Sequence, residues 1–212
     1  MAASADADIL DDQDDTDVAS GLLDLLADRT GGIYHSVADG ENFPEVAWAG
    51  RCLPEDPGSI TWAWKPLAGI PSDSLTKTQR DTIESKRFSY YVNIAGNPRT
   101  FEGAVSQPGV FIDIVRGMDW LRFRLAEDMV AILANDDIPY IGGDAVIEST
   151  MRARLDQAVE RGVIAPDYTV TVPPASQQQL SDRVDRIYNN VTFEATLTGK
   201  VHRVRIRGTV TV

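Results

Sequence analysis

The sequence is poor in the residues on which most catalytic and metal-binding sites are built. Cys52 is the only cysteine among the 212 residues, which excludes a disulfide within the chain and suits a reducing compartment. His35 and His202 are the only histidines, and they lie far apart in strand-like contexts. No phosphate-binding loop, dinucleotide glycine pattern, nucleophile elbow or pair of zinc-binding cysteines is present. We therefore expect no enzyme activity, no metal and no cofactor.

Two further shortages exclude other classes of protein. Basic residues are outnumbered, and the net charge of −12 argues against nucleic acid or an anionic membrane as the main partner. No run of about 18 apolar residues occurs, and no basic start precedes an apolar core, so we expect neither a membrane span nor a signal peptide. The hydrophobic fraction of 43% is that of an ordinary globular protein of one domain or two small ones.

Two pairs of reactive residues keep a hydrolase open as an interpretation, ranked below the two structural functions given at the end of this subsection. Cys52 and His35 could form a nucleophile and its base. Cys52 lies beside apolar neighbours in a predicted helix, however, which favours an inert core thiol. Asp136 and Asp137 could act as acid and base, but a helix-ending turn before Pro139 explains them sufficiently.

The first part of the chain is strongly acidic. Nine Asp residues and no Lys or Arg occur up to Asp28, and most of residues 2–17 are predicted to form a mobile loop. Read as a calcium loop that starts at Asp12, the segment has Asp17 in place of the turn glycine and Leu23 in place of the last glutamate, so the EF-hand template fails. Asp17 is instead predicted to cap a helix. The expected apolar face of this helix is Val18, Leu22, Leu25 and Leu26.

Hydrophobic periodicity predicts strands and helices along the rest of the chain. Strands are expected at residues 33–36, 60–64, 88–94, 109–115 and 168–172. Helices are expected from Pro44, from Ser72 or Ser74 to about Arg87, from residue 115 to about Ala134, from Gly143 to Gly162, and at 178–187. Ile60, Trp62 and Trp64 share one face of their strand, which favours core packing over a stacking surface for a ligand.

Residues 191–212 are predicted to form a β-hairpin. Residues 191–197 alternate between apolar and polar side chains, Thr198-Gly199-Lys200 supplies the turn, and residues 201–212 alternate again. The second strand is too long for the first to pair completely, so residues 209–212 are left as an apolar edge without charge. Such an edge favours strand addition to a neighbouring subunit. The other interpretation is a terminal strand paired within its own sheet.

These elements predict an α+β fold, in which two long helices pack on a largely antiparallel sheet that ends in a C-terminal hairpin. Three segments are expected: an acidic segment and helix at 1–41, a linking α+β region at 42–108 and an assembly domain at 109–212. The hairpin contrasts in charge with the acidic start, because Glu194 is its only acidic residue. Its basic residues are Lys200, Arg203, Arg205 and Arg207. The two ends could attract each other between copies, although solvated faces explain them nearly as well.

Several short segments stand in a characteristic order from about Thr30 to the end of the chain. They are PEVAWAG at 44–50, LPEDPGS at 53–59, TWAWK at 61–65, LAG at 67–69, YY at 90–91, FID at 111–113, RGMDWL at 116–121, IPY at 138–140, FEATL at 193–197, GKVH at 199–202 and GTVTV at 208–212. Together they resemble the C-terminal half of the tail sheath proteins of contractile-tailed bacteriophages. They are structural signatures and not catalytic ones.

The resemblance implies a virion protein that is assembled in the cytoplasm of a bacterial host. Its subunits would stack in six-fold rings around the tail tube, in an extended metastable state. A signal from the baseplate would let the rings relax to a shorter, wider helix that drives the tube through the host envelope without nucleotide hydrolysis. Family members exchange terminal strands and are usually longer. Here residues 2–9 begin as if in mid-domain. This indicates a fragment, or a family member that lacks half of the strand-exchange contacts between subunits.

With this resemblance, the C-terminal strand becomes the predicted assembly interface. Its residues are Val204, Ile206, Gly208, Thr209, Val210, Thr211 and Val212. Charged contacts to a neighbouring subunit or to the tube are predicted for Arg203, Arg205, Arg207, Arg152 and Arg154. The expected partners are other copies of the chain, the tail tube protein and the baseplate. The alternative function is a non-contractile structural or adaptor protein of a virion or injection apparatus, which needs no shortened state.

Overall fold

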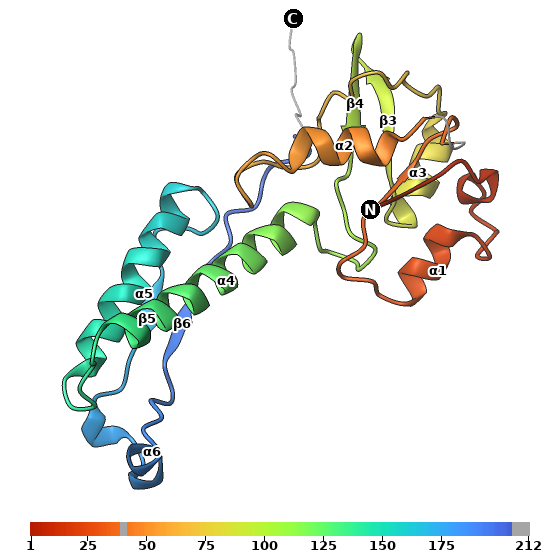
Figure 1. The fold of residues 1–212 in the computed structure, drawn as a ribbon. Helices are drawn as coiled ribbons and strands as arrows, with labels where there is room; N and C mark the ends of the chain where they lie inside the picture. Colours follow the sequence, from red (N-terminus) through yellow and green to blue (C-terminus); the bar gives the residue numbers. More distant parts are fainter. Residues whose placement is uncertain (39–41, 205–212) are drawn as a thin grey trace, which may run out of the picture. The chain divides into compact units, whose positions relative to one another are not determined.

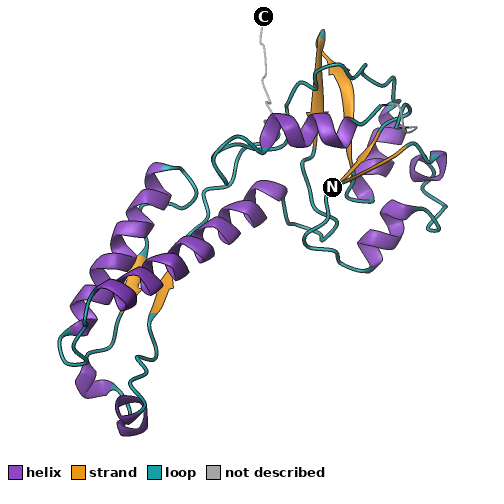
Figure 2. Ribbon diagram, viewed as in Figure 1, coloured by secondary structure: helices purple, strands orange, loops and turns teal. Residues whose placement is uncertain are grey.

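The computed structural model of the protein describes residues 1–38 and 42–204. The chain divides into two compact units (Figure 1). Unit 1 comprises Met1–Asp56, Ile60–Val115 and Gly199–Val212, and unit 2 comprises Pro57–Ser59 and Arg116–Thr198. The expected α+β class is confirmed, since both units contain helices and strands (Figure 2). The predicted segments 1–41 and 42–108 fall almost entirely in unit 1.

Unit 1 is built on a mixed sheet whose four strands follow one another in sequence order. They are β1 (Ala2–Ser4), β2 (Gly32–Tyr34), β3 (Ser89–Ile94) and β4 (Asn97–Phe101). The first two pairings are parallel and only β3–β4 is antiparallel, so the expectation of a largely antiparallel sheet is wrong here. The physical reason is the long helical connection before β2 and again before β3, because such crossovers bring strands back in the same direction.

Helix starts in unit 1 follow their capping residues. Besides a short 3₁₀ turn, η1 (Ala7–Leu10), the helices are α1 (Val18–Asp24), α2 (Pro44–Cys52) and α3 (Lys77–Ser85). Pro44 opens α2 as predicted. α3 begins later than predicted because Thr76 and Gln79 form a capping box, which fixes the first turn.

The acidic segment is more ordered than its composition suggests. It contains β1 and η1, so the mobile-loop prediction for residues 2–17 is wrong for these parts. Asp17 caps α1 as predicted, by accepting hydrogen bonds from the backbone N–H groups of Ala19 and Ser20. The predicted apolar face of α1 is wrong for Val18, Leu25 and Leu26, which are exposed, whereas Leu22 packs against a core cluster of unit 1 as predicted.

Two short apolar runs predicted as strands adopt other structures. Residues 60–64 form bends and a turn, and Trp64 has a positive φ of 64°, which no extended strand contains. In the 109–115 run, Phe111 makes an isolated bridge with Ala104, and a helix begins at the next residue. Short apolar runs do not distinguish a strand from a buried turn or helix start, which explains both errors.

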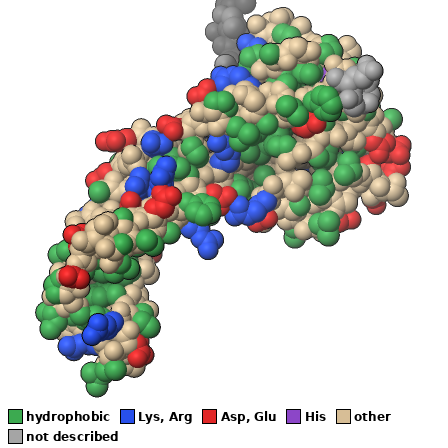
Figure 3. Space-filling view, in the orientation of Figure 1, with side chains coloured by type: hydrophobic (Ala, Val, Ile, Leu, Met, Phe, Trp, Pro, Cys, Tyr) green, Lys and Arg blue, Asp and Glu red, His purple; other side chains and the backbone are tan. Residues whose placement is uncertain are grey.

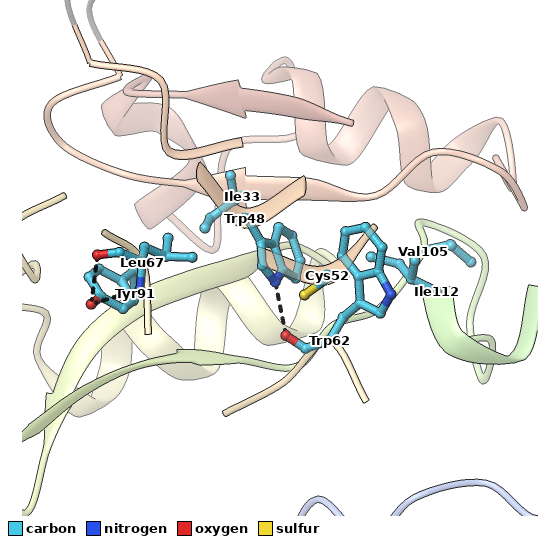
Figure 4. Close-up of a cluster of buried hydrophobic side chains, with 8 residues drawn as sticks. All are labelled: Ile33, Trp48, Cys52, Trp62, Leu67, Tyr91, Val105 and Ile112. Atoms are coloured by element: carbon cyan, nitrogen blue, oxygen red, sulfur yellow. Dashed lines mark hydrogen bonds between the residues drawn. The ribbon is translucent and has the colours of Figure 1, made fainter. Parts of the chain in front are cut away.

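One core cluster of unit 1 lies between α2 and the sheet (Figure 4). Trp48 and Trp62 meet edge to face with ring centroids 5.4 Å apart, and Trp48 Nε1 donates a hydrogen bond of 2.9 Å to the Trp62 carbonyl. Cys52 is fully buried beside them. Trp62 therefore packs in the core, as the sequence predicts, although it does not do so from a strand.

Unit 2 consists of two long helices and a two-stranded sheet. α4 (Ile112–Asn135), whose first turn belongs to unit 1, and α5 (Gly143–Glu160) correspond in part to the two long helices predicted, since α4 begins before residue 115 and the sheet that they contact in unit 2 has two strands. Gly162 follows α5 with a φ of 66°. After them come β5 (Thr169–Thr171), η2 (Ala175–Gln177), α6 (Leu180–Val184) and β6 (Thr192–Glu194). Within the described residues, no helix is long and apolar enough to span a bilayer.

The predicted C-terminal hairpin is not formed in the described residues. β6 pairs antiparallel with β5, Phe193 opposite Val170, and not with the residues that follow Gly199. An isolated bridge between Ile164 and Leu197 extends this pairing. Residues 201–204 are not in a strand, and the rest of the predicted second strand, 205–212, lies outside the described residues. The alternation in 191–197 identifies a strand correctly but does not identify its partner.

Candidate functional site

The best-defined site in unit 1 is the place where the C-terminal segment, residues 199–204, lies on it. His202 is the centre of this contact. Its Nε2 lies 2.7 Å from the Thr61 hydroxyl oxygen, and its backbone carbonyl accepts a 3.1 Å hydrogen bond from Trp64 Nε1. The imidazole also meets the Phe111 ring edge to face at 4.8 Å. Residue 64, with its positive φ, thus positions an indole donor for the segment.

Burial of His202 opposes its protonation. Burial lowers the pKa of His202, although Asp113 and Glu102 act in the other direction. Burial also raises the pKa of Asp113, a residue that is 4% exposed and whose Oδ1 has no hydrogen-bond partner among the described residues. The neutral imidazole is therefore the form that suits the site, because a buried charge without full pairing is costly.

Arg203 fixes the segment on the other side of His202. Its guanidinium forms ion pairs with Glu84, at 2.7 Å, and with Glu102, and it lies 5.0 Å from the centroid of the Phe101 ring. Glu84 also accepts a 2.6 Å hydrogen bond from the Tyr90 hydroxyl. A contact from Arg203 to another subunit would have to compete with these two carboxylates.

The other predicted arginines of the described residues lie on α5. Arg152 pairs with Glu148 one turn earlier at 2.7 Å, an exposed pair of the kind that contributes little to stability. Arg154 binds Asp128 of α4 through two nitrogens, at 2.6 and 2.7 Å, so it joins the two long helices. Arg154 therefore has a structural role within unit 2, whereas Arg152 lies on the surface.

The predicted assembly strand is only partly within the described residues. Val204 is 77% exposed and does not share in the contact that His202 and Arg203 make with unit 1. The remaining predicted residues, Arg205, Ile206, Arg207, Gly208, Thr209, Val210, Thr211 and Val212, lie outside the described residues.

The two-stranded sheet of unit 2 is a second notable surface. One of its faces packs on the long helices through partly buried residues such as Val170, Ala195 and Leu197. In the described part of the chain, neither outer edge of this sheet is paired with a further strand. The sequence of its first strand, Thr-Val-Thr-Val at 169–172, is repeated at 209–212. An open edge of this kind is a template for strand addition.

The acidic segment is organised by an internal cation that sequence reasoning missed. Lys86 is 7% exposed, and its ammonium donates to Asp17 Oδ2 at 2.7 Å. It also donates to three backbone carbonyls, those of Asp8, Asp11 and Asp14, at 3.0, 2.7 and 2.8 Å. These four contacts hold the segment in place, although it fails the calcium template. No local pattern identifies a lysine so far away in sequence.

The candidates for catalysis do not form a site. Cys52 is enclosed in the core, and His35 is fully buried, with Nε2 2.7 Å from the Pro71 carbonyl and its ring stacked on Tyr91. Asp136 and Asp137 are exposed after the end of α4. Throughout residues 1–38 and 42–204, no group of three His, Cys, Asp or Glu side chains could hold a metal ion.

No protein-family model matches the chain, and no curated protein matches it significantly.

Proposed function

We propose that the chain is a structural subunit of a contractile bacteriophage tail sheath, which polymerises around the tail tube through strand exchange between subunits. The sequence motifs supply the resemblance. The observation that carries the proposal is the two-stranded β5–β6 sheet of unit 2, whose outer edges are unpaired in the described residues. The long helices cover one face of this sheet, but its edges keep unpaired backbone groups that an added strand can bind.

The C-terminal segment has the composition of the missing strand. Residues 209–212 repeat the Thr-Val-Thr-Val of β5, which already pairs with a strand of this sheet. A copy of that pattern on a free edge would place its valines on one face and its threonines on the other. The exchanged strand would consist of Val204, Ile206, Gly208, Thr209, Val210, Thr211 and Val212.

His202 and Arg203 set the point from which the exchanged strand departs. Because these two residues are held on unit 1, only Val204 and the residues after it are available to reach another copy. Eight residues, 205–212, span at most about 26 Å when extended. The accepting edge of the neighbouring subunit must therefore lie within that distance of Val204. Arg205 and Arg207 would meet acidic side chains of the neighbour on the way.

Deletion of residues 209–212 tests the exchange. The deletion should abolish ordered tubes seen by electron microscopy, and so should Val210→Pro, which removes a backbone donor without shortening the chain. Val210→Ile is the matched control and should assemble normally. Intact tubes after the deletion would contradict the proposal. Tubes of a single length, with no shortened form after a trigger, would favour the non-contractile alternative.

The tube contact is tested separately on the exposed arginine of α5. Arg152→Glu should weaken co-assembly with the tail tube protein, measured by co-sedimentation, because Arg152 lies on the surface of α5 in an exposed ion pair with Glu148, one turn earlier. Arg183→Glu, on α6, is the control for a general change of charge. Equal co-sedimentation of wild type and Arg152→Glu would exclude a contact between Arg152 and the tail tube.

A further inference from the structure

The C-terminal segment, residues 199–204, is held on unit 1 mainly by side chains. His202 binds through its imidazole and its carbonyl, and Arg203 binds through its guanidinium. The chain just before the segment is held by its backbone instead, since Thr198 N donates a 3.1 Å hydrogen bond to the Val163 carbonyl in unit 2. Residues 199–204 belong to no strand, so the segment can leave unit 1 without breaking a strand pairing.

The contacts of Arg203 are open to water. Its side chain is 47% exposed, and exposed ion pairs contribute little to stability. Figure 3 shows acidic and basic side chains exposed on both units, so charged side chains in contact with water are common on this protein. Val201 and Val204, on either side of the two anchoring residues, are each 77% exposed. Detachment of the segment therefore uncovers little apolar surface at these two positions.

The residues that bind the segment stay paired when it leaves. Glu84 keeps the 2.6 Å hydrogen bond from the Tyr90 hydroxyl. Glu102 keeps Arg87, whose Nη1 lies 3.8 Å from Glu102 Oε2. The Thr61 hydroxyl oxygen keeps a 3.1 Å hydrogen bond from a backbone N–H. Neither carboxylate is left without a partner, so detachment avoids the large penalty of an unpaired buried charge.

Detachment lengthens the part of the chain that can reach away from the molecule. With the segment bound, residues 205–212 span at most about 26 Å beyond Val204. With the segment detached, residues 199–212 span at most about 46 Å beyond Thr198. The two states differ both in reach and in the point from which the chain departs.

We propose that residues 199–204 are a latch, meaning a segment that detaches from unit 1 and rebinds while unit 1 stays folded. The C-terminal arm, residues 199–212, then has a short form and a long form. Local opening of this kind is typical of segments with few buried contacts. The latch itself is a property of the single chain. Its use rests on the proposed function: the short form sets the spacing of subunits, and the long form lets an exchanged strand stay bound as subunits move apart.

Trypsin cleavage after Arg203 in the folded protein measures detachment, because a protease needs an extended segment on both sides of the bond. All chains carry Arg205→Gln and Arg207→Gln to remove competing sites, and mass spectrometry identifies the released peptide 204–212. Below the unfolding transition the rate should depend little on urea, since local detachment exposes little surface. The activity of trypsin in urea is corrected with a free peptide of residues 199–212. A urea dependence as steep as that of the unfolding of unit 1 would overturn the proposal.

Two substitutions on unit 1 weaken the latch and leave the cleaved bond intact. Glu84→Gln removes a charge but keeps an oxygen for the Tyr90 hydroxyl, and Thr61→Val removes the hydroxyl that contacts the imidazole. Together they should raise the cleavage rate about tenfold, because one ion pair and one hydrogen bond of the bound state are lost. Glu148→Gln, which breaks the exposed ion pair of Arg152 on α5, is the control. A rate no higher than that of the control would show that these contacts do not hold the segment.

A reversible lock tests the latch in assembled tubes. Glu84→Cys and Arg203→Cys are joined by a reducible bismaleimide, and the control joins Lys77→Cys to Asp81→Cys, an exposed pair on α3. Buried Cys52 stays in place. Locked tubes should keep one length after a trigger, and reduction should restore shortening.

The outcomes separate the latch from the proposed function. Locked tubes that shorten as the control does would overturn the role of the long form. Locked chains that form no tubes, unlike the control, would overturn the role of the short form in spacing the subunits. Absence of tubes from the wild-type chain counts against the proposed function, and the proteolysis then decides on the latch by itself.

Discussion

Replacing Lys86 with methionine removes the ammonium around which the acidic segment folds. The side chain is 8% exposed and donates to Asp17 and to the carbonyls of Asp8, Asp11 and Asp14. Methionine keeps a similar length and an apolar stem, so the change isolates the charge and its hydrogen bonds from packing.

The expected loss follows from the buried carboxylate that remains. Removing one partner of a buried ion pair costs about 3–5 kcal/mol, because the other charge stays away from water. The lower end applies here, since Asp17 keeps hydrogen bonds from the N–H groups of Ala19 and Ser20 and from the Ser20 hydroxyl. We expect the free energy of unfolding of unit 1 to fall by about 3 kcal/mol, out of about 5–15 kcal/mol for a typical domain.

Urea unfolding followed by tryptophan fluorescence measures this loss, because Trp48 and Trp62 are buried in unit 1. Lys77→Met is the matched control, since its ion pair with Asp81 is exposed on α3 and should contribute little. A loss at Lys86 no larger than that at Lys77 would refute the reasoning.

The pH dependence of the same loss is a second check. Burial raises the pKa of Asp17, but hydrogen bonds from Lys86 and Ser20 outweigh it and hold the pKa below the usual value. A lowered pKa stabilises the fold above the unfolded value of about 3.9, and this stabilisation is lost as the pH falls through the folded pKa. The difference between wild type and Lys86→Met should therefore be full at pH 7 and shrink below about pH 4.

Further substitutions test the packing and the C-terminal site. Gly32→Ala puts a methyl group 2.2 Å from the ring of buried Phe88, so thermal unfolding should show a loss of about 1–3 kcal/mol. Gly50→Ala meets no atom within 4 Å and should instead stabilise α2 by roughly 0.5–1 kcal/mol, and equal effects at the two glycines would contradict the packing. Because burial lowers the pKa of His202, its contribution to holding residues 199–204 is complete above about pH 6.5 and is lost as the pH falls through the lowered value. Hydrogen exchange of these amides, corrected for intrinsic rates, should rise on acidification, and a pH dependence that persists in His202→Gln would contradict this role.

The helices could be predicted because their signals are local. Pro44 at the start of α2, Asp17 before α1 and Gly162 after α5 act on neighbouring backbone groups, and the structure confirms all three. The 3.6-residue periodicity of α4 and α5 also extends over enough turns to exclude a strand.

Features that depend on distant residues could not be predicted in the same way. The hydrogen bonds of the Lys86 ammonium join residues about 70 positions apart. In the sequence, Lys86 and its aspartate partners each look like ordinary charged surface residues. The parallel pairing of β1 with β2 depends on the crossover between them, which periodicity does not describe. Trp64 has a positive φ, so the apparent strand at 60–64 is a loop, and this loop binds His202. The alternation of apolar residues does not reveal a positive φ.

The pairing of β6 within the described residues favours strand exchange. A hairpin would use the residues after Gly199 to cover an edge of β6. The structure instead pairs β6 with β5 and holds His202 on unit 1, so residues 201–204 leave that edge uncovered. A two-stranded sheet whose edges are unpaired within residues 1–38 and 42–204 and a terminal Thr-Val-Thr-Val segment in the same chain are complementary, and the eight residues after Val204 limit how far apart they can be. Lengthening the segment by a flexible insertion after Val204 should therefore preserve strand addition but loosen the spacing of subunits, which electron microscopy of the tubes would show as a less regular helical rise. An unchanged rise would mean that the anchor at His202 does not set the spacing.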